Sequence, residues 1–185
     1  MNDVNIVVNF LEPKFNRLRN ALENSQLLPA DAELRLELLY ELPVWCGPSY
    51  FAQLFEQDGK IHAIYVRPEY VENNVKYDGY FDSLKWCKNN PYKYFRLTCG
   101  KLLNVFEKSV LDEFCADIRA LPGFCGYNEL QIDGIYRAFG YYQNHEMTHL
   151  YLDRTDLYFF RDALHRRVFD IIQERIVRAT GLKQG

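Results

Sequence analysis

The dipeptide Asp58-Gly59 constrains the fold of this chain more than any other feature of its sequence. It separates two apolar runs, SYFAQLFEQ and KIHAIYVRP. Asp-Gly between two such runs is a strong signal of a β-hairpin, because a type I′ turn needs a positive φ at both central positions. We therefore expect residues 34–67 to form an antiparallel meander.

The segment ELRLELLYELP, which precedes this hairpin, has two interpretations. Apolar residues alternate with mostly polar ones, which is typical of a half-buried strand. The leucine, glutamate and arginine content favours a helix instead. The alternation decides our prediction, so we expect a strand that ends before the break at Gly47-Pro48. The alternating apolar positions are Leu34, Leu36, Leu38, Tyr40 and Leu42.

Apolar residues at helical spacing predict three longer helices. The first covers Pro13–Asn24, since proline is tolerated at a first helical position. The second covers Lys101–Ala120, and the third runs from about Asp156 to Arg178 with Leu157 and Phe160 in its buried stripe. Between the first two we expect a polar loop at 68–79, a short helix at 81–88 and a strand at YKYFRLT.

The runs ELQIDGIYRAFGYYQ and THLYLD predict a second hairpin, with residues 144–147 at its tip. Hairpins rather than a regular alternation of strands and helices indicate the α+β class. We expect one domain over residues 1–185, with a mainly antiparallel sheet, made of the meander and the hairpin, packed by amphipathic helices.

Composition and charge narrow the class of protein further. Of the 185 residues, 48% are hydrophobic and 25% are charged, as in an ordinary globular protein. We find no run long and apolar enough for a membrane helix and no basic region of the kind that opens a signal peptide. We therefore expect a cytoplasmic protein that does not bind membranes, with its five cysteines reduced.

The motif WCGPS at residues 45–49 resembles the thioredoxin active-site signature, with serine in place of the second cysteine. Thiol exchange would require a low-pKa Cys46 at the start of a helix. The segment from Ser49 to Asp58 is too short for the helix that follows this motif in thioredoxins, and the hairpin requires antiparallel pairing. We expect a turn here, with the reactivity of Cys46 left open.

The motif HEMTH at residues 145–149 fits HExxH. On a helix, His145 and His149 would share a face and bind one zinc ion, while Glu146 would activate the bound water. The alternation on both sides of the motif favours a hairpin instead. A zinc-dependent metallohydrolase using these three residues remains our alternative function, but we expect neither metal nor cofactor.

The charges argue against nucleic acid as a partner, and the acidic surface is either a solvated face or one that attracts a basic partner. Between Asp82 and Glu107 lie five basic residues and interleaved aromatics, a pattern that can bind single strands. However, the net charge is −3, and residues 1–59 hold nine acidic against four basic residues. An acidic surface attracts basic partners, so we expect no nucleic-acid binding.

The last third of the chain resembles a known family. Ile132-Asp133-Gly134 is followed by Tyr136 and Phe139, then by the hairpin and a closing amphipathic helix. This pattern of about 55 residues resembles that of the small cytoplasmic immunity proteins that protect bacteria from their own polymorphic or contact-dependent toxins. The resemblance implies a non-enzymatic inhibitor that binds the catalytic domain of one cognate toxin.

The partner-binding residues would project from the 132–153 hairpin, away from the face that packs on the core. We assign them from the alternation along the two strands, in which a shift of one residue would exchange the faces. The alternative is that the same aromatic residues pack under the last helix. The candidates are Tyr136, Tyr142, Glu146, Tyr151 and Asp153.

Overall fold

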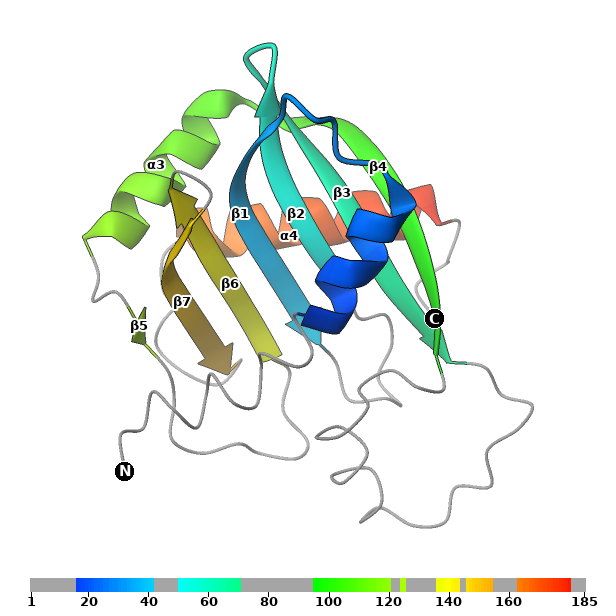
Figure 1. Ribbon diagram of the computed structural model, residues 1–185. Coiled ribbons are helices and arrows are strands. Elements are labelled where there is room, and N and C mark those ends of the chain that lie inside the picture. Colours follow the sequence, from blue (N-terminus) through cyan, green and yellow to red (C-terminus); the bar gives the residue numbers. More distant parts are fainter. Residues whose placement is uncertain are drawn as a thin grey trace.

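The computed structural model describes residues 16–41, 50–70, 95–120, 124–125, 136–143, 146–154 and 163–180. Its strands join one seven-stranded sheet with the order β4-β3-β2-β1-β6-β7-β5 (Figure 1). The strands are β1 (Glu33–Glu41), β2 (Tyr50–Gln57), β3 (Lys60–Tyr70), β4 (Phe95–Phe106), β5 (Phe124–Cys125), β6 (Tyr136–Gln143) and β7 (Glu146–Arg154). The labelled helices are α3 (Lys108–Arg119) and α4 (Ala163–Ala179), and residues 16–25 are also helical.

The hairpin between β2 and β3 turns at Asp58 and Gly59, whose φ angles are 53° and 69°. Positive φ at both central positions is what a type I′ turn requires. β1 pairs antiparallel with β2, β2 with β3, and β3 with β4. The predicted meander is therefore confirmed, and it extends by one more strand.

The ambiguous segment ELRLELLYE is strand β1, as its alternation predicted. β1 lies inside the sheet, with β2 on one side and β6 on the other, both antiparallel to it. Its backbone therefore bonds to two neighbours, and this pairing outweighs the helix propensity of leucine and glutamate.

The second predicted hairpin joins β6 and β7, whose ladder begins at the pair formed by Gln143 and Glu146. The predicted tip was too long, because Glu146 and Met147 already belong to β7. β7 continues to Arg154 and also pairs with the two-residue strand β5, in parallel. The other pairings in the described sheet are antiparallel. The predicted α+β class with a mainly antiparallel sheet is thus confirmed.

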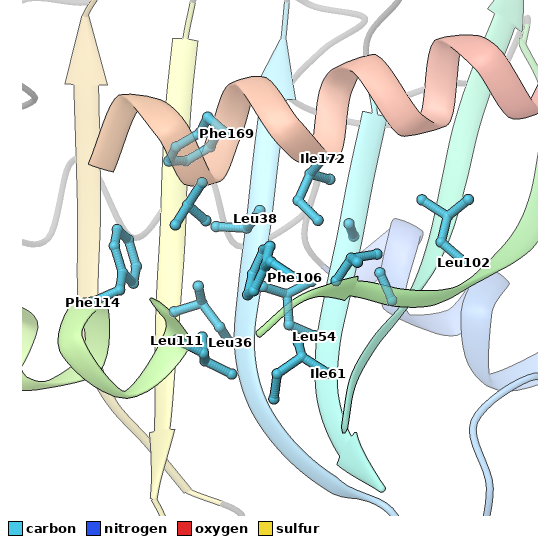
Figure 2. Packing of buried hydrophobic residues seen from close by; sticks show 14 of the residues in the cluster. Leu36, Leu38, Leu54, Ile61, Leu102, Phe106, Leu111, Phe114, Phe169 and Ile172 are labelled. Carbon is cyan, nitrogen blue, oxygen red and sulfur yellow. The ribbon is translucent and has the colours of Figure 1, made fainter. Parts of the chain in front are cut away.

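One face of the sheet carries the larger hydrophobic core, under α3 and α4 (Figures 1 and 2). Leu38 and Leu54 of the sheet and Phe114 of α3 are fully buried there, as is Phe169 of α4. The hydroxyl of Tyr50 donates to the carbonyl of Phe169 at 3.3 Å, which fixes α4 to β2. Burying each large apolar side chain stabilises the fold by about 1.5–3 kcal/mol.

The opposite face is covered by the helix at residues 16–25, drawn in blue in Figure 1. Leu18 and Leu22 are four residues apart, so they share one face of this helix, and both are fully buried. They pack in a second hydrophobic cluster with Leu39, Phe51 and other residues of the sheet. The predicted helix at Pro13–Asn24 is confirmed from residue 16 on, and Pro13 lies outside the described residues.

The predicted helix at Lys101–Ala120 was wrong in its first part, because β4 continues to Phe106 and α3 begins at Lys108. Phe106 pairs with Ile61 and Leu102 pairs with Ala63, so β4 advances four residues where β3 advances two. Asn104 takes a positive φ of 49° within this bulge. Because of the bulge, Leu102, Val105 and Phe106 are buried in one cluster. Their spacing of three and four positions is the same as that of buried residues on a helix, which explains the wrong prediction.

Strand β3 is longer than expected, because residues 68–70, predicted to open a loop, belong to it. Pro68 pairs with Leu97 and Tyr70 with Phe95. The predicted strand YKYFRLT is seen from Phe95 on, as the start of β4.

Several predictions fall outside the described residues: the WCGPS motif with Cys46, the short helix at 81–88, and the start of the last helix with Leu157 and Phe160. From Ala163 to Ala179 the predicted last helix is present as α4, with Val168 and Ile172 fully buried. No helix in the described part of the chain has the length and apolar character needed to cross a membrane.

Candidate functional site

The candidate partner-binding residues lie on β6 and β7, and the register gives the position of each. β6 pairs with β1, whereas the short strand β5 pairs with only Leu150 and Tyr151 of β7, so most of β7 has no outer neighbour among the described strands. Glu146 opens β7 at the hairpin end and is exposed. The pairs are Tyr136 with Arg154, Tyr142 with Met147, Glu146 with Gln143, Tyr151 with Phe139, and Asp153 with Arg137.

These positions do not all share one row of the ladder. The pair containing Tyr136 is directly followed by the pair containing Asp153, and consecutive pairs belong to alternate rows. Tyr151 shares the row of Asp153. Apart from that of Glu146, the side chains of the five candidates lie outside what the structure describes, so their binding role stays a prediction.

The described part of the HExxH motif, residues 146–149, lies on a strand rather than on a helix. Residues 146–154 form strand β7, and His149 pairs with Tyr141 of β6. Positions four apart in a strand are separated by about 13 Å, against about 6 Å on a helix. This spacing does not suit two ligands of one zinc ion, and His145 lies outside the described residues. Within the described ranges, no three His, Cys, Asp or Glu residues form a group that could hold a metal.

A buried ion pair that the sequence did not predict lies under the helix at residues 16–25. The side chain of Glu37 is fully buried, whereas that of Arg19 is 21% exposed. The Arg19 Nε donates to both carboxylate oxygens of Glu37, at 2.8 and 3.0 Å, and Nη2 donates to Oε2 at 2.6 Å. Gln53 Nε2 donates to Oε1 at 2.9 Å. The carboxylate is therefore bound from the helix and from β2.

This arrangement ties the helix to the sheet. A carboxylate removed from water is stable only when it is paired and hydrogen-bonded, and both conditions are met here. The sequence alone did not predict that Glu37 is buried. Glu37 occupies a polar position of an alternating strand, and side chains at such positions usually contact solvent. The helix that covers this row changes the environment of Glu37.

A second group of charges joins β1 and β2 to the start of α3. Arg35, at the irregularity in the β1–β2 register, donates to Glu56 at 2.8 Å and to Asp112 at 3.4 Å. Lys108 donates to Asp112 at 2.7 Å and lies 3.3 Å from Glu56. The hydrogen bond between Lys108 and Asp112 raises the pKa of the lysine and lowers that of the carboxyl. Two bases and two acids thus neutralise one another.

His62 supports the bulge in β4. Its Nδ1 accepts a hydrogen bond of 2.8 Å from the backbone N–H of Asn104, the residue with positive φ. Burial lowers the pKa of His62, and the charges of Lys101 and Lys60 lower it further. The imidazole is therefore held neutral with Nδ1 as an acceptor, a structural role rather than that of a proton donor.

The described thiols behave as small apolar side chains. Cys115 is fully buried in the larger core, and burial raises its pKa to about 11. Cys99 packs against the second cluster, and burial raises its pKa as well. Neither thiol is suited to act as a nucleophile at neutral pH.

The outer edge of β4 is the remaining surface feature. β4 is the last strand on its side of the sheet. Leu103 of β4 is 59% exposed, which is unusual among the large apolar side chains of the described residues. Its carbonyl accepts a hydrogen bond of 2.9 Å from Arg175 Nη2 of α4. Arg96 and Lys101 of the same strand are exposed.

Comparisons with family models, with curated proteins and with solved structures found no match to this chain.

Proposed function

We propose that this protein is a non-enzymatic binding protein of the immunity type, which neutralises a cognate bacterial toxin by binding the toxin's catalytic domain. The observation that carries the proposal is the arrangement of the last third of the chain. Strand β6 turns into β7, and the amphipathic helix α4 then packs on the same sheet. The resemblance to immunity proteins rests on this order of elements.

The paired charges of the scaffold support a role in binding. Glu37 is held by Arg19 and Gln53, and Arg35 and Lys108 are paired with carboxylates. These contacts order the sheet and its helices before any partner arrives. A preorganised surface loses little conformational entropy on association, which favours tight binding.

The contact surface in this proposal is the β6–β7 hairpin. Tyrosine supplies a large rigid contact area with a polar tip, and a few such anchors carry most of the energy of an interface. Glu146, exposed at the hairpin end, would speed the encounter with a basic partner. The proposed contacts divide between the two rows of the ladder: Tyr136 and Tyr142 lie in one row, and Glu146, Tyr151 and Asp153 lie in the other, so the partner would contact one of these two sets.

The cellular setting belongs to the same proposal. An inhibitor of this kind acts in the cytoplasm of the bacterium that makes the toxin, and it needs neither metal nor cofactor. Because a small free fraction of toxin remains harmful, the affinity has to be nanomolar or tighter, which corresponds to about −12 kcal/mol. Interfaces that bind this well commonly bury about 1,600 Å².

The experiment is a titration of the full-length protein against the toxin domain encoded beside its gene, followed by calorimetry. We expect one-to-one binding in the nanomolar range. Alanine at each of the five hairpin positions should weaken binding at the anchors by 2 kcal/mol or more, as is typical of hot spots. The matched control is Glu113→Ala on α3, an exposed acid outside the hairpin, which should bind like the wild type.

Melting temperatures separate the possible outcomes. Weaker binding with an unchanged melting temperature would support the hairpin as the contact surface. Loss of folding would show that these residues form core rather than interface. Absence of any binding by the wild-type protein would contradict the proposed function itself.

A further inference from the structure

The sheet ends at β4, and this edge has the features of a binding site for another strand. In the described part of the chain β4 pairs with β3 alone, so its outer edge carries a row of backbone N–H and C=O groups. With twelve residues, β4 is about twice the usual strand length. Partners that bind by strand addition use such an edge, and its backbone groups supply much of the affinity.

The first half of β4 keeps a regular ladder. From Phe95 to Lys101 each residue pairs in turn with β3, and the register shift comes only after Leu102. A regular extended edge matches the repeat of an incoming strand, whereas a bulge interrupts it. The accessible part of the edge is therefore residues 95–101.

The charged side chains of β4 itself are basic. β4 contains Arg96 and Lys101 and no acidic residue, and Glu69 of β3 is opposite Arg96 in the ladder. Lys101 Nζ lies 5.2 Å from the ring centre of Phe55, so its charge is held close to the sheet. α4 adds Arg175, whose guanidinium reaches the backbone of Leu103. In Figure 1 the red, C-terminal end of α4 lies beside β4.

We infer that the outer edge of β4, flanked by Arg96, Lys101 and Arg175, binds an acidic extended segment of a protein partner, which adds to the sheet as a further strand. Leu103, exposed at the start of the bulge that follows the regular ladder, supplies an apolar contact. The inference rests on the proposed function, because it names a second surface that a protein partner would use beside the β6–β7 hairpin.

A second copy of this chain fits the edge less well. Pairing β4 with itself would place basic side chains of the two copies on both faces of the joined strands, with no acidic residue on either strand. Like charges on adjacent strands destabilise the pair, and basic side chains on an edge oppose self-association. An acidic strand gains from the same charges, so the occupant is a different chain.

The test uses the full-length protein and two synthetic peptides. In one peptide glutamate alternates with valine, and in the other lysine replaces every glutamate. Hydrogen exchange of the β4 amides is measured without peptide, with each peptide, and at high salt. We expect fast exchange of every second amide at 95–101 in the free protein and slower exchange with the acidic peptide only, with the effect reduced by salt.

Two arginines of α4 provide a matched pair of variants. Arg175→Glu changes the charge beside β4, and Arg167→Glu makes the same change at an exposed position in the first half of the helix. We expect Arg175→Glu to weaken binding of the acidic peptide about tenfold, as for the loss of a charged contact, and Arg167→Glu to leave it unchanged. Leu103→Ser should also weaken binding, while the melting temperature stays the same.

Several results would overturn the inference. Slow exchange along 95–101 in the free protein would show that the edge is covered. Equal binding of the two peptides, or equal effects of the two arginine substitutions, would show that the charges do not select the partner. A dimer at micromolar concentration, or binding of a single-stranded oligonucleotide in place of the peptide, would show a different occupant. If the toxin domain binds but the acidic peptide does not, the edge site is wrong and the proposed function stands. If the peptide binds but no toxin domain does, the proposed function is wrong and the edge site stands.

Discussion

The guanidinium of Arg19 forms three hydrogen bonds of 2.6–3.0 Å with the fully buried carboxylate of Glu37. The two residues are 18 positions apart in the sequence and lie on different elements, a helix and the central strand β1. The pair therefore fixes where the helix at residues 16–25 sits on the sheet.

Removing Arg19 alone should be strongly destabilising. Arg19→Met would leave the Glu37 carboxylate buried without its cation, which costs about 3–5 kcal/mol of unfolding free energy. Urea unfolding measures this loss. The double variant Arg19→Met with Glu37→Met should be more stable than the single variant, because no buried charge remains. A single variant as stable as the wild type would mean that Glu37 reaches water.

Gly100 should not tolerate a side chain. A Cβ at this position would lie 2.5 Å from the ring of Tyr65, the residue opposite on β3. Such overpacking costs about 1–3 kcal/mol, so Gly100→Ala should lower the melting temperature. In a Tyr65→Leu background the same substitution should cost much less. An equal cost in both backgrounds would show that the aromatic ring is not the cause.

The stability of the protein should depend on His62 at mildly acidic pH. Burial and two lysines lower the pKa of folded His62, so the unfolded chain binds the proton first as the pH falls. The contribution of His62 to the free energy of unfolding should be complete above about pH 6.5. It should decrease as the pH falls from there to the pKa of the folded state.

Denaturant unfolding from pH 7.5 to pH 5 measures this dependence, with His62→Gln as the control that cannot titrate. The difference in unfolding free energy between wild type and variant should shrink as the pH falls. A difference that stays constant over this range would contradict the hydrogen bond from Asn104 to a neutral imidazole.

Zinc should not be required for folding. Residues 146–149 lie on strand β7 rather than on a helix, so we expect no stoichiometric zinc in the purified protein. His145→Ala together with His149→Ala should change the free energy of unfolding by less than about 1 kcal/mol, as for surface substitutions. Elemental analysis that finds one zinc per chain, lost in the double variant, would restore the hydrolase alternative.

Local patterns in the sequence were enough to predict the hairpins. Asp58-Gly59 permits positive φ at both turn positions, and the alternation in β1 matches the pleat of a strand. Both patterns depend only on residues that are close in the chain, and both are present in the folded structure. The α+β class followed from them.

Long-range packing explains what the sequence did not reveal. The bulge at Asn104 is held by His62 of another strand, and without this contact Leu102, Val105 and Phe106 have the spacing of a helix. Glu37 looks like a solvent-exposed residue until a helix is known to cover its row of the sheet. The rows of the β6–β7 ladder depend on register, which alternation along one strand does not determine.

The most direct test of toxin neutralisation is the activity of the toxin domain encoded beside this gene, measured as this protein is added. We expect the activity to fall linearly and to reach zero at one molecule of this protein per molecule of toxin, because binding is tight and blocks the catalytic domain. Unchanged toxin activity in the presence of a large excess of the folded protein would contradict it.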